Sequence, residues 1–229
     1  MPPKPSGPWP AAPRLPAQLD AGGPLEDGGA WAGADAGAQQ SFDGGVRDFD
    51  ITASRLRAVR LTGAVLEGGR WADVVVEDCE LSGMTLEGTT WARVAFRGCR
   101  MSGMVAIGVK AVDVMFTDCR IDAANFRGSA FERCAFDGCD LARADFYGAR
   151  LAPGAMRRCS LVEADFSKAQ CEGLDLRGSD LSGVIGAASL RGCTITPEQM
   201  VPLGLALVAS LGVRVEDTID DPVSRRSPS

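Results

Sequence analysis

Cysteine is the most reactive side chain that this sequence repeats at a fixed spacing. Five cysteines stand at every twentieth position, namely Cys79, Cys99, Cys119, Cys139 and Cys159. A stacked column of sulfur atoms could bind a soft metal or take part in redox chemistry. However, the sequence has no Cys-x-x-Cys pair, and a ladder does not offer the tetrahedral geometry of a zinc site. Because cysteine is also a small apolar residue, we predict buried free thiols, with no metal and no cofactor.

Two carboxylates with the same spacing, Asp145 and Asp165, could be a catalytic acid and base. The chain of 229 residues contains no histidine, which excludes Ser-His and Cys-His mechanisms and every His-ligated metal site. The two aspartates also align with Asn125, which precedes Asp145 by the same interval. We therefore expect them to be surface groups or corner hydrogen-bonding groups, and we expect the protein not to be an enzyme.

A five-residue repeat positions all of these side chains. Among the 27 residues taken at every fifth position from Ile51 to Leu181, only Ala106, Ala111 and Cys171 lack a large apolar side chain. Small residues stand two positions before these centres and glycine often stands two positions after them. Neither a helix nor a long strand has this period, whereas short extended segments joined by tight corners do. The residues predicted to point into the core include Trp71, Trp91, Phe96, Phe116, Phe126, Phe136, Phe146 and Phe166.

A longer period, four times the five-residue repeat, predicts how the segments stack. It relates the five cysteines, and it also relates Trp71 to Trp91. Four segments therefore close one roughly square coil, and about seven coils form a rod on the order of 30 to 35 Å long. The small centres Ala106 and Ala111 have two explanations: either the indole of Trp91 needs the room, or the register bulges locally and Ile107 and Val112 become the centres.

Four triplets show a resemblance to a known family. The sequence contains Ala124-Asn125-Phe126, Ala144-Asp145-Phe146, Ala164-Asp165-Phe166 and Ser179-Asp180-Leu181. These triplets resemble the signature of the pentapeptide repeat proteins, in which Ala, Asp or Asn, and Leu or Phe precede two variable residues. The resemblance implies an all-β solenoid, a right-handed quadrilateral β-helix, and the residues after it add a short C-terminal helical cap.

Composition divides the chain into four parts. We expect a disordered Pro/Gly/Ala-rich tail over 1–45, the repeat body over 46–195, a helical cap or dimerisation segment over 196–215, and a disordered tail over 216–229. Thr196-Pro197-Glu198-Gln199 has the form of a capping box that opens a helix. The helix is apolar on almost every side, so we predict that it covers the end of the solenoid and forms a homodimer through Leu203, Leu207 and Leu211.

No signal peptide or long apolar run is evident, so we expect a cytoplasmic protein without membrane contact. The predicted function is a non-catalytic scaffold that binds an unknown protein partner through its rigid surface. The family resemblance implies an alternative, a DNA mimic that inhibits or protects DNA gyrase. A mimic needs a sustained negative field, yet residues 46–193 carry 19 basic and 20 acidic side chains. Only a local acidic surface at Asp145, Glu163 and Asp165 favours mimicry, so we rank it second and expect no direct nucleic-acid binding.

Overall fold

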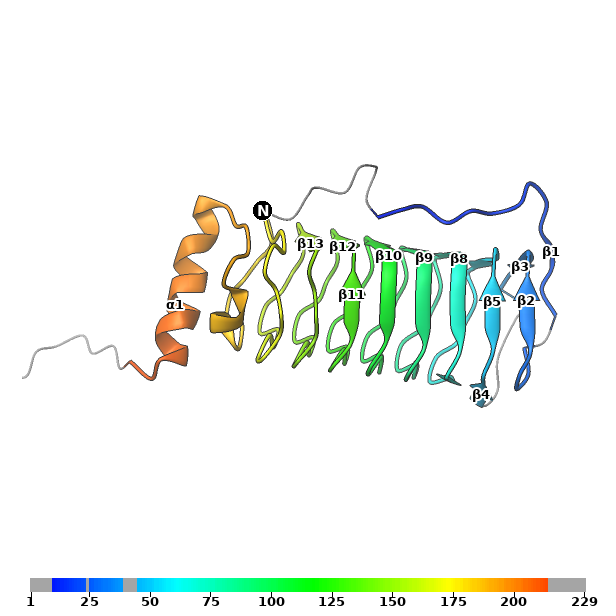
Figure 1. Cartoon of the computed structure of the whole chain (residues 1–229), viewed down its shortest axis with the longest axis horizontal. Helices are drawn as coiled ribbons and strands as arrows, with labels where there is room; N and C mark the ends of the chain where they lie inside the picture. The colour runs from blue at the N-terminus through cyan, green and yellow to red at the C-terminus, as the bar shows by residue number, and fades with distance from the viewer. Residues whose placement is uncertain (1–9, 24, 39–44, 214–229) are drawn as a thin grey trace, which may run out of the picture.

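The computed structural model describes residues 10–23, 25–38 and 45–213 and shows a rod of stacked coils with a helix at one end (Figure 1). Every strand pairing between coils is parallel, and most pairs join residues that are 20 positions apart, as in Trp71 with Trp91 and Ala111 with Trp91. The solenoid predicted from the two periods is therefore the observed fold.

Short strands form the straight sides of the coils. Their bounds are β1 (Asp20–Ala21), β2 (Ala30–Ala32), β3 (Ala34–Ala36), β4 (Gly45–Arg47), β5 (Asp50–Thr52), β6 (Arg55–Arg57), β7 (Val65–Glu67), β8 (Arg70–Glu77), β9 (Thr90–Arg97), β10 (Lys110–Thr117), β11 (Ala130–Glu132), β12 (Cys134–Asp137) and β13 (Gly154–Arg157). In the long strands β8, β9 and β10, one residue with positive φ stands in the middle, as at Asp73. Each long strand thus contains two repeats joined by a left-handed residue.

The core consists of side-chain ladders that run along the rod axis. Phe96, Phe116 and Phe136 stack face to face, with ring centroids 4.8 and 4.4 Å apart. A second ladder joins Phe146 to Phe126 in the preceding coil and Phe166 in the next, with both centroid distances at 5.3 Å. All of the aromatic residues expected in the core are buried. Because each coil buries its apolar residues against its neighbours, the fold gains stability with every coil added.

The small centres Ala106 and Ala111 keep their register. Ala111 pairs directly with Trp91, and both alanines are fully buried. Ile107 is 37% exposed, so it has not replaced Ala106 in the core. The bulge explanation is therefore wrong, and the small side chain of Ala111 lies next to Trp91 of the preceding coil.

The N-terminal boundary that we predicted is wrong. The segment 1–45 was expected to be disordered, but β2 pairs with β5 and β3 pairs with β6, so residues 30–36 form part of a coil. Trp31 is buried and pairs with Ile51 in the next coil. The five-residue register thus continues backwards through Ala36 to Trp31, past a stretch whose many glycines and alanines hide the apolar period. The predicted tail 216–229 lies outside the described residues.

At the C-terminal end the repeat slips by one residue and then stops. Asp175 pairs with Thr194, only 19 positions away. The 3-10 turn η1 (Ala187–Leu190) precedes Thr194, and a second 3-10 turn, η2 (Pro197–Gln199), and the helix α1 (Met200–Ser210) follow it. The predicted capping box opens η2, and Pro202 is accommodated in the first turn of α1, where its missing N–H is not needed. Among the described residues, no helix is long and apolar enough to span a membrane.

Candidate functional site

The cysteine column is a structural element of the core. All five thiols are buried and unpaired, and each donates a hydrogen bond to the carbonyl oxygen two residues before it, as Cys159 does to Arg157 at 3.2 Å. The described residues contain no cluster of side chains that could hold a metal ion. For the neighbouring thiol Cys134, burial raises the pKa to about 12. Buried thiols held in this way are poor nucleophiles at neutral pH.

The two aspartates proposed as an alternative catalytic pair stabilise corners. One carboxylate oxygen of Asp145 accepts a hydrogen bond from the backbone N–H of Tyr147 at 2.8 Å. The other accepts one from the guanidinium group of Arg127, also at 2.8 Å. Asp165 accepts the backbone N–H of Ser167 at 2.7 Å. Both carboxylates are thus engaged with the turn that follows them. Glu163 lies on the exposed surface nearby.

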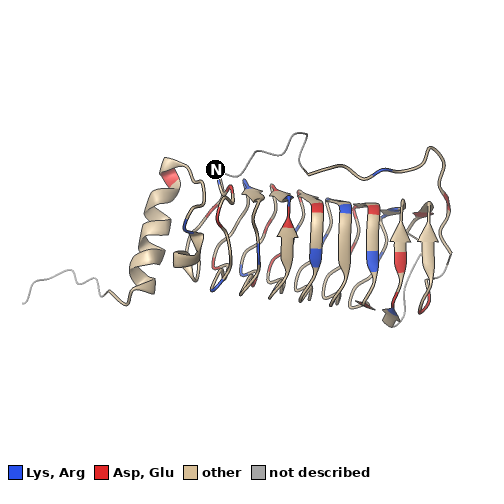
Figure 2. Cartoon of the chain, in the orientation of Figure 1, with Lys and Arg blue, Asp and Glu red and all other residues tan. Residues whose placement is uncertain are grey.

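Charges of opposite sign alternate along the rod. Figure 2 shows Lys and Arg side by side with Asp and Glu on successive coils. Several ion pairs join residues at the same place in adjacent coils, including Arg97 with Glu77 at 3.0 Å and Arg70 with Asp50 at 3.5 Å. In each such pair, the acidic side chain of one coil is neutralised by the arginine of the next coil. Duplex mimicry requires a sustained acidic face, and these ion pairs reduce the net negative charge of the coils on which they lie.

The strongest apolar feature on the surface is the outer side of α1. Val201 is 70% exposed, Leu205 65% and Leu211 76%. On the inner side, Leu203 is half-buried against the core cluster, and Leu207 lies at the boundary with 36% exposure. The apolar helix predicted from the sequence is present, but Leu203 packs against the core of the solenoid and does not lie on the outer side of the helix.

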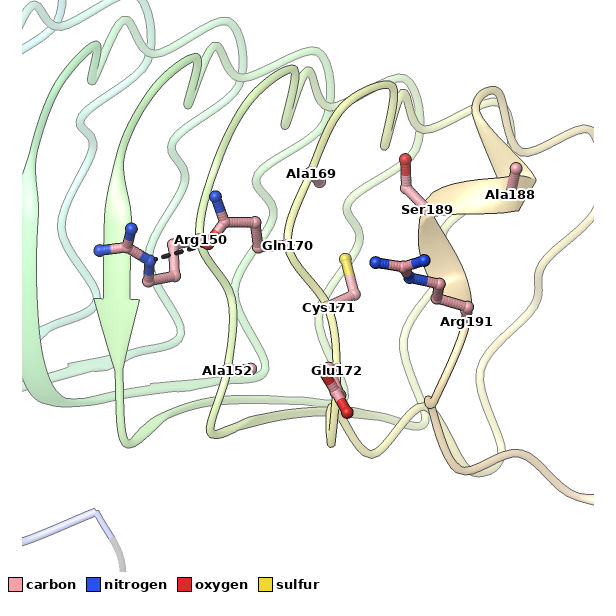
Figure 3. A pocket seen from close by; sticks show the side chains of 9 residues that line it. All are labelled: Arg150, Ala152, Ala169, Gln170, Cys171, Glu172, Ala188, Ser189 and Arg191. Atoms are coloured by element: carbon pink, nitrogen blue, oxygen red, sulfur yellow. Dashed lines mark hydrogen bonds between the residues drawn. The ribbon is translucent and has the colours of Figure 1, made fainter. Parts of the chain in front are cut away.

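A shallow pocket of about 640 Å³ opens near the C-terminal end of the rod (Figure 3). The side chains of Arg150 and Arg191 enter it from opposite sides, with Glu172 below. Arg150 donates to the side-chain oxygen of Gln170 at 3.1 Å. Cys171 is buried, and its hydrogen bond with Cys193 together with burial raises its pKa. The pocket offers polar contacts to a ligand but no activated nucleophile.

Sequence reasoning missed a further feature, a charged column beneath an N-terminal segment. The column consists of Asp73, Arg93, Asp113 and Arg133, and we call it the track; residues 10–19, which run along the rod above it, are called the strap (Figure 1). The alternation of sign from one coil to the next was visible in the sequence. The partner segment was not recognised because its prolines indicated a tail.

Comparison with known proteins agrees with the geometry. A family model described as a pentapeptide repeat region matches residues 89–166, and another, for eight copies of pentapeptide repeats, matches residues 155–183. No curated protein matches the chain.

Three solved structures match the chain at low identity. Trypsin-treated QnrB1, a plasmid-mediated fluoroquinolone resistance protein, is 18% identical, with 87% of this chain and 99% of that chain covered and a TM-score of 0.48. HetL, a pentapeptide repeat protein involved in heterocyst differentiation regulation from the cyanobacterium Nostoc, is 17% identical, with coverages of 73% and 83% and a TM-score of 0.36. The pentapeptide repeat protein Rfr23 from the cyanobacterium Cyanothece is 11% identical, with coverages of 60% and 88% and a TM-score of 0.20.

Identities and TM-scores this low carry no argument about function. The family is identified by the two family models and by the regular coils with their stacked phenylalanines. The chain belongs to the pentapeptide repeat proteins.

Proposed function

We propose that this protein is a non-catalytic, protein-binding scaffold whose rigid β-helix is joined to a second copy through α1. The observation that carries the proposal is the exposed apolar side of the helix at the end of the rod, where Val201, Leu205 and Leu211 are each at least 65% exposed. Contiguous apolar surface of this kind is typical of an interface between proteins.

The geometry of the cap favours a homodimer over a lone monomer. The solenoid end covers only the inner side of α1, through Leu203 and Ala206, and leaves the outer side to solvent. No charged residue stands between Met200 and Val213, so nothing on the helix opposes close contact with a second apolar helix. Two copies related by a twofold axis would each present the same side to the other.

The paired charges disfavour the alternative function, a DNA mimic that acts on gyrase. Arginines neutralise acidic groups on several coils, and at Asp175 the hydrogen bond from Arg177 holds the pKa of the carboxyl well below its usual range. A supercoiling assay with gyrase from the same source is the direct test, and we expect weak inhibition or none. The free thiols fit the reducing conditions of the cytoplasm, which is the compartment that we propose.

Sedimentation of the full chain tests the dimer. We expect wild type to sediment as a dimer and Leu205→Asp to sediment as a monomer with an unchanged circular dichroism spectrum. Ile107→Asp is the matched control, because Ile107 is exposed on the side of the rod, away from α1, and its change should leave the dimer intact. A wild-type monomer at high protein concentration would remove the proposal.

A further inference from the structure

The track is built from left-handed residues that project charged groups from one side of the rod. Asp73, Arg93, Asp113 and Arg133 have φ values of 57°, 53°, 57° and 52°. Each interrupts a long strand or joins two short ones, so it stands at the same place on four successive coils. Within the track, Arg93 binds Asp73 through two hydrogen bonds of 2.6 Å, and Arg133 binds Asp113 through two of 2.9 Å.

Each aspartate of the track also binds the backbone of the strap. The N–H of Arg14 donates to Asp73 Oδ1 at 2.9 Å, and the N–H of Ala11 donates to Asp113 Oδ1 at 3.3 Å. The side chains of Asp73 and Asp113 are only 18% and 15% exposed; the hydrogen bond from Ala11 is partly buried, and the one from Arg14 is exposed. The arginines fix both carboxylates, and the remaining lone pairs of Oδ1 then face the strap.

The spacing of the two contacts matches the spacing of the coils. Asp73 and Asp113 are two coils apart, which is about 9.6 Å at the usual distance between strands. Ala11 and Arg14 are three residues apart, and three residues of extended or polyproline chain span roughly 9 to 10 Å. The donors of the strap and the acceptors of the track therefore have the same repeat distance.

Prolines in the strap reinforce this spacing. Pro10, Pro13 and Pro16 recur every three residues, and both donating residues directly follow a proline. Proline has no N–H and holds the chain extended, so the prolines leave few other backbone donors and reduce the entropy lost on binding. Pro16 reaches the same column at Gly33, where a Cβ would lie 3.8 Å from the proline ring.

We propose that the track is a binding site for an extended peptide with a proline at every third residue, and that the strap of the same chain occupies it. The site recognises backbone N–H groups through carboxylates, so it selects for spacing more than for side chains. While the strap is bound, this side of the rod is closed to other partners. The inference does not depend on the C-terminal dimer.

Trypsin measures whether the strap is bound in the full chain. Arg14 is the only Lys or Arg between Pro5 and Val46, so cleavage after Arg14 gives one diagnostic product by mass spectrometry. A protease must pull this segment off the track before it can cut. We expect the double variant D73A/D113A to be cut after Arg14 about tenfold faster than wild type, since it loses both hydrogen bonds to charged acceptors. Asp175→Ala, which removes an ion-paired carboxylate elsewhere, should not change the rate.

A pair of proline substitutions in the strap tests the same contact without touching the solenoid. Ala11→Pro removes the N–H that binds Asp113, and we expect severalfold faster cleavage. Ala12→Pro is the matched control, because Ala12 is exposed and both donating amides remain. Equal rates for the two variants would overturn the proposal, even if D73A/D113A fails to fold. Protection that disappears on dilution would overturn the assignment of the strap to its own chain.

Discussion

The middle of the rod and its C-terminal end follow the same five-residue repeat but handle its register differently. In the middle, β8, β9 and β10 align over seven residue pairs at a constant offset of 20, and the buried apolar side chains stack on one another. At the end, η1 interrupts the repeat, the offset falls to 19 between Asp175 and Thr194, and the chain then continues into η2 and α1. Backbone hydrogen bonds still join Thr194 to Leu174 and Leu176 after this change of one residue, and the stacking ends just beyond them, where η2 begins.

The difference teaches that register, more than composition, maintains the solenoid. The C-terminal segment is at least as apolar as the middle, with Leu203, Leu205 and Leu207 in succession. Out of register, these side chains cannot join a ladder, because each ladder requires the same residue position in the next coil. They form a helix whose inner side covers the last coil and protects its strand edges.

The largest effect is expected from removing a rung in the middle of the rod. Phe136 stacks on Phe116 at 4.4 Å and meets Phe126 and Phe131 edge on. Phe136→Ala should lower the free energy of unfolding by roughly 3 to 5 kcal/mol, as truncation of a buried aromatic usually does. The control is Arg100→Ala on the exposed surface, where a change within about 0.5 kcal/mol is expected. Similar urea midpoints for the two variants would contradict the inward assignment.

A pair of glycines compares the two regions directly. Both Gly88, in the middle, and Gly186, at the slip, have positive φ, at 64° and 69°. At Gly88 an added Cβ meets no atom within 4 Å, whereas at Gly186 it would lie 2.4 Å from the backbone nitrogen of Ser167. Gly88→Ala should cost about 1 kcal/mol for the left-handed conformation alone.

Gly186→Ala should cost roughly 1 to 3 kcal/mol more, because the backbone of the previous coil must move. Thermal unfolding of the two variants under identical conditions measures the difference. Equal losses of stability would mean that the slip tolerates rearrangement and that the end of the rod is not rigidly packed.

Most of the fold could be predicted from the sequence because each ladder position repeats many times. The triplets around Phe126, Phe146 and Phe166 define the register, and the cysteine column defines the length of a coil. The prediction failed where the signal is brief, as at Trp31, because the next two positions in the register, Ala36 and Ser41, are small residues. The right hand of the helix came only from the family resemblance.

The candidate site was harder to predict than the fold. The apolar helix was found from Leu203, Leu207 and Leu211, but which side faces outward depends on how it packs on the last coil, and this is a tertiary property. The strap was missed because its contacts are between backbone N–H groups and side chains that lie far away in the sequence. Composition alone does not encode such a contact, because the prolines recur every three residues and the charged residues every twenty, and the two spacings match only as distances in the folded structure.

A smaller effect is expected at the cap, where one side chain ties the helix to the last coil. Gln199 is buried, and its side-chain nitrogen donates to the carbonyl oxygens of Leu176 at 2.7 Å and Ser179 at 2.6 Å. Gln199→Ala leaves both acceptors without this donor and should cost about 1 to 3 kcal/mol. The matched control is Gln170→Ala, since Gln170 is exposed and bonds only to a surface arginine in the described structure. If Gln199→Ala lost no more stability than Gln170→Ala, the hydrogen bonds of Gln199 would not hold the helix on the last coil.

The smallest effect concerns pH and the strap. The hydrogen bonds from Arg93 and Arg133 hold the pKa values of Asp73 and Asp113, respectively, below the usual range, and the strap N–H groups lower them further. A carboxyl group whose pKa is lowered in the bound state favours binding above its ordinary pKa of about 3.9, and the contribution is lost as the pH falls through the lowered value. The strap should therefore stay bound from neutral pH down to about pH 4 and be released at lower pH. In NMR spectra, the amide signals of Ala11 and Arg14 should shift together over this acidic range, while that of Ala12 moves less. Movement centred at or above the ordinary value would show that the strap amides do not favour the ionised carboxylates, and the track would then lose its role as an acceptor for the peptide backbone.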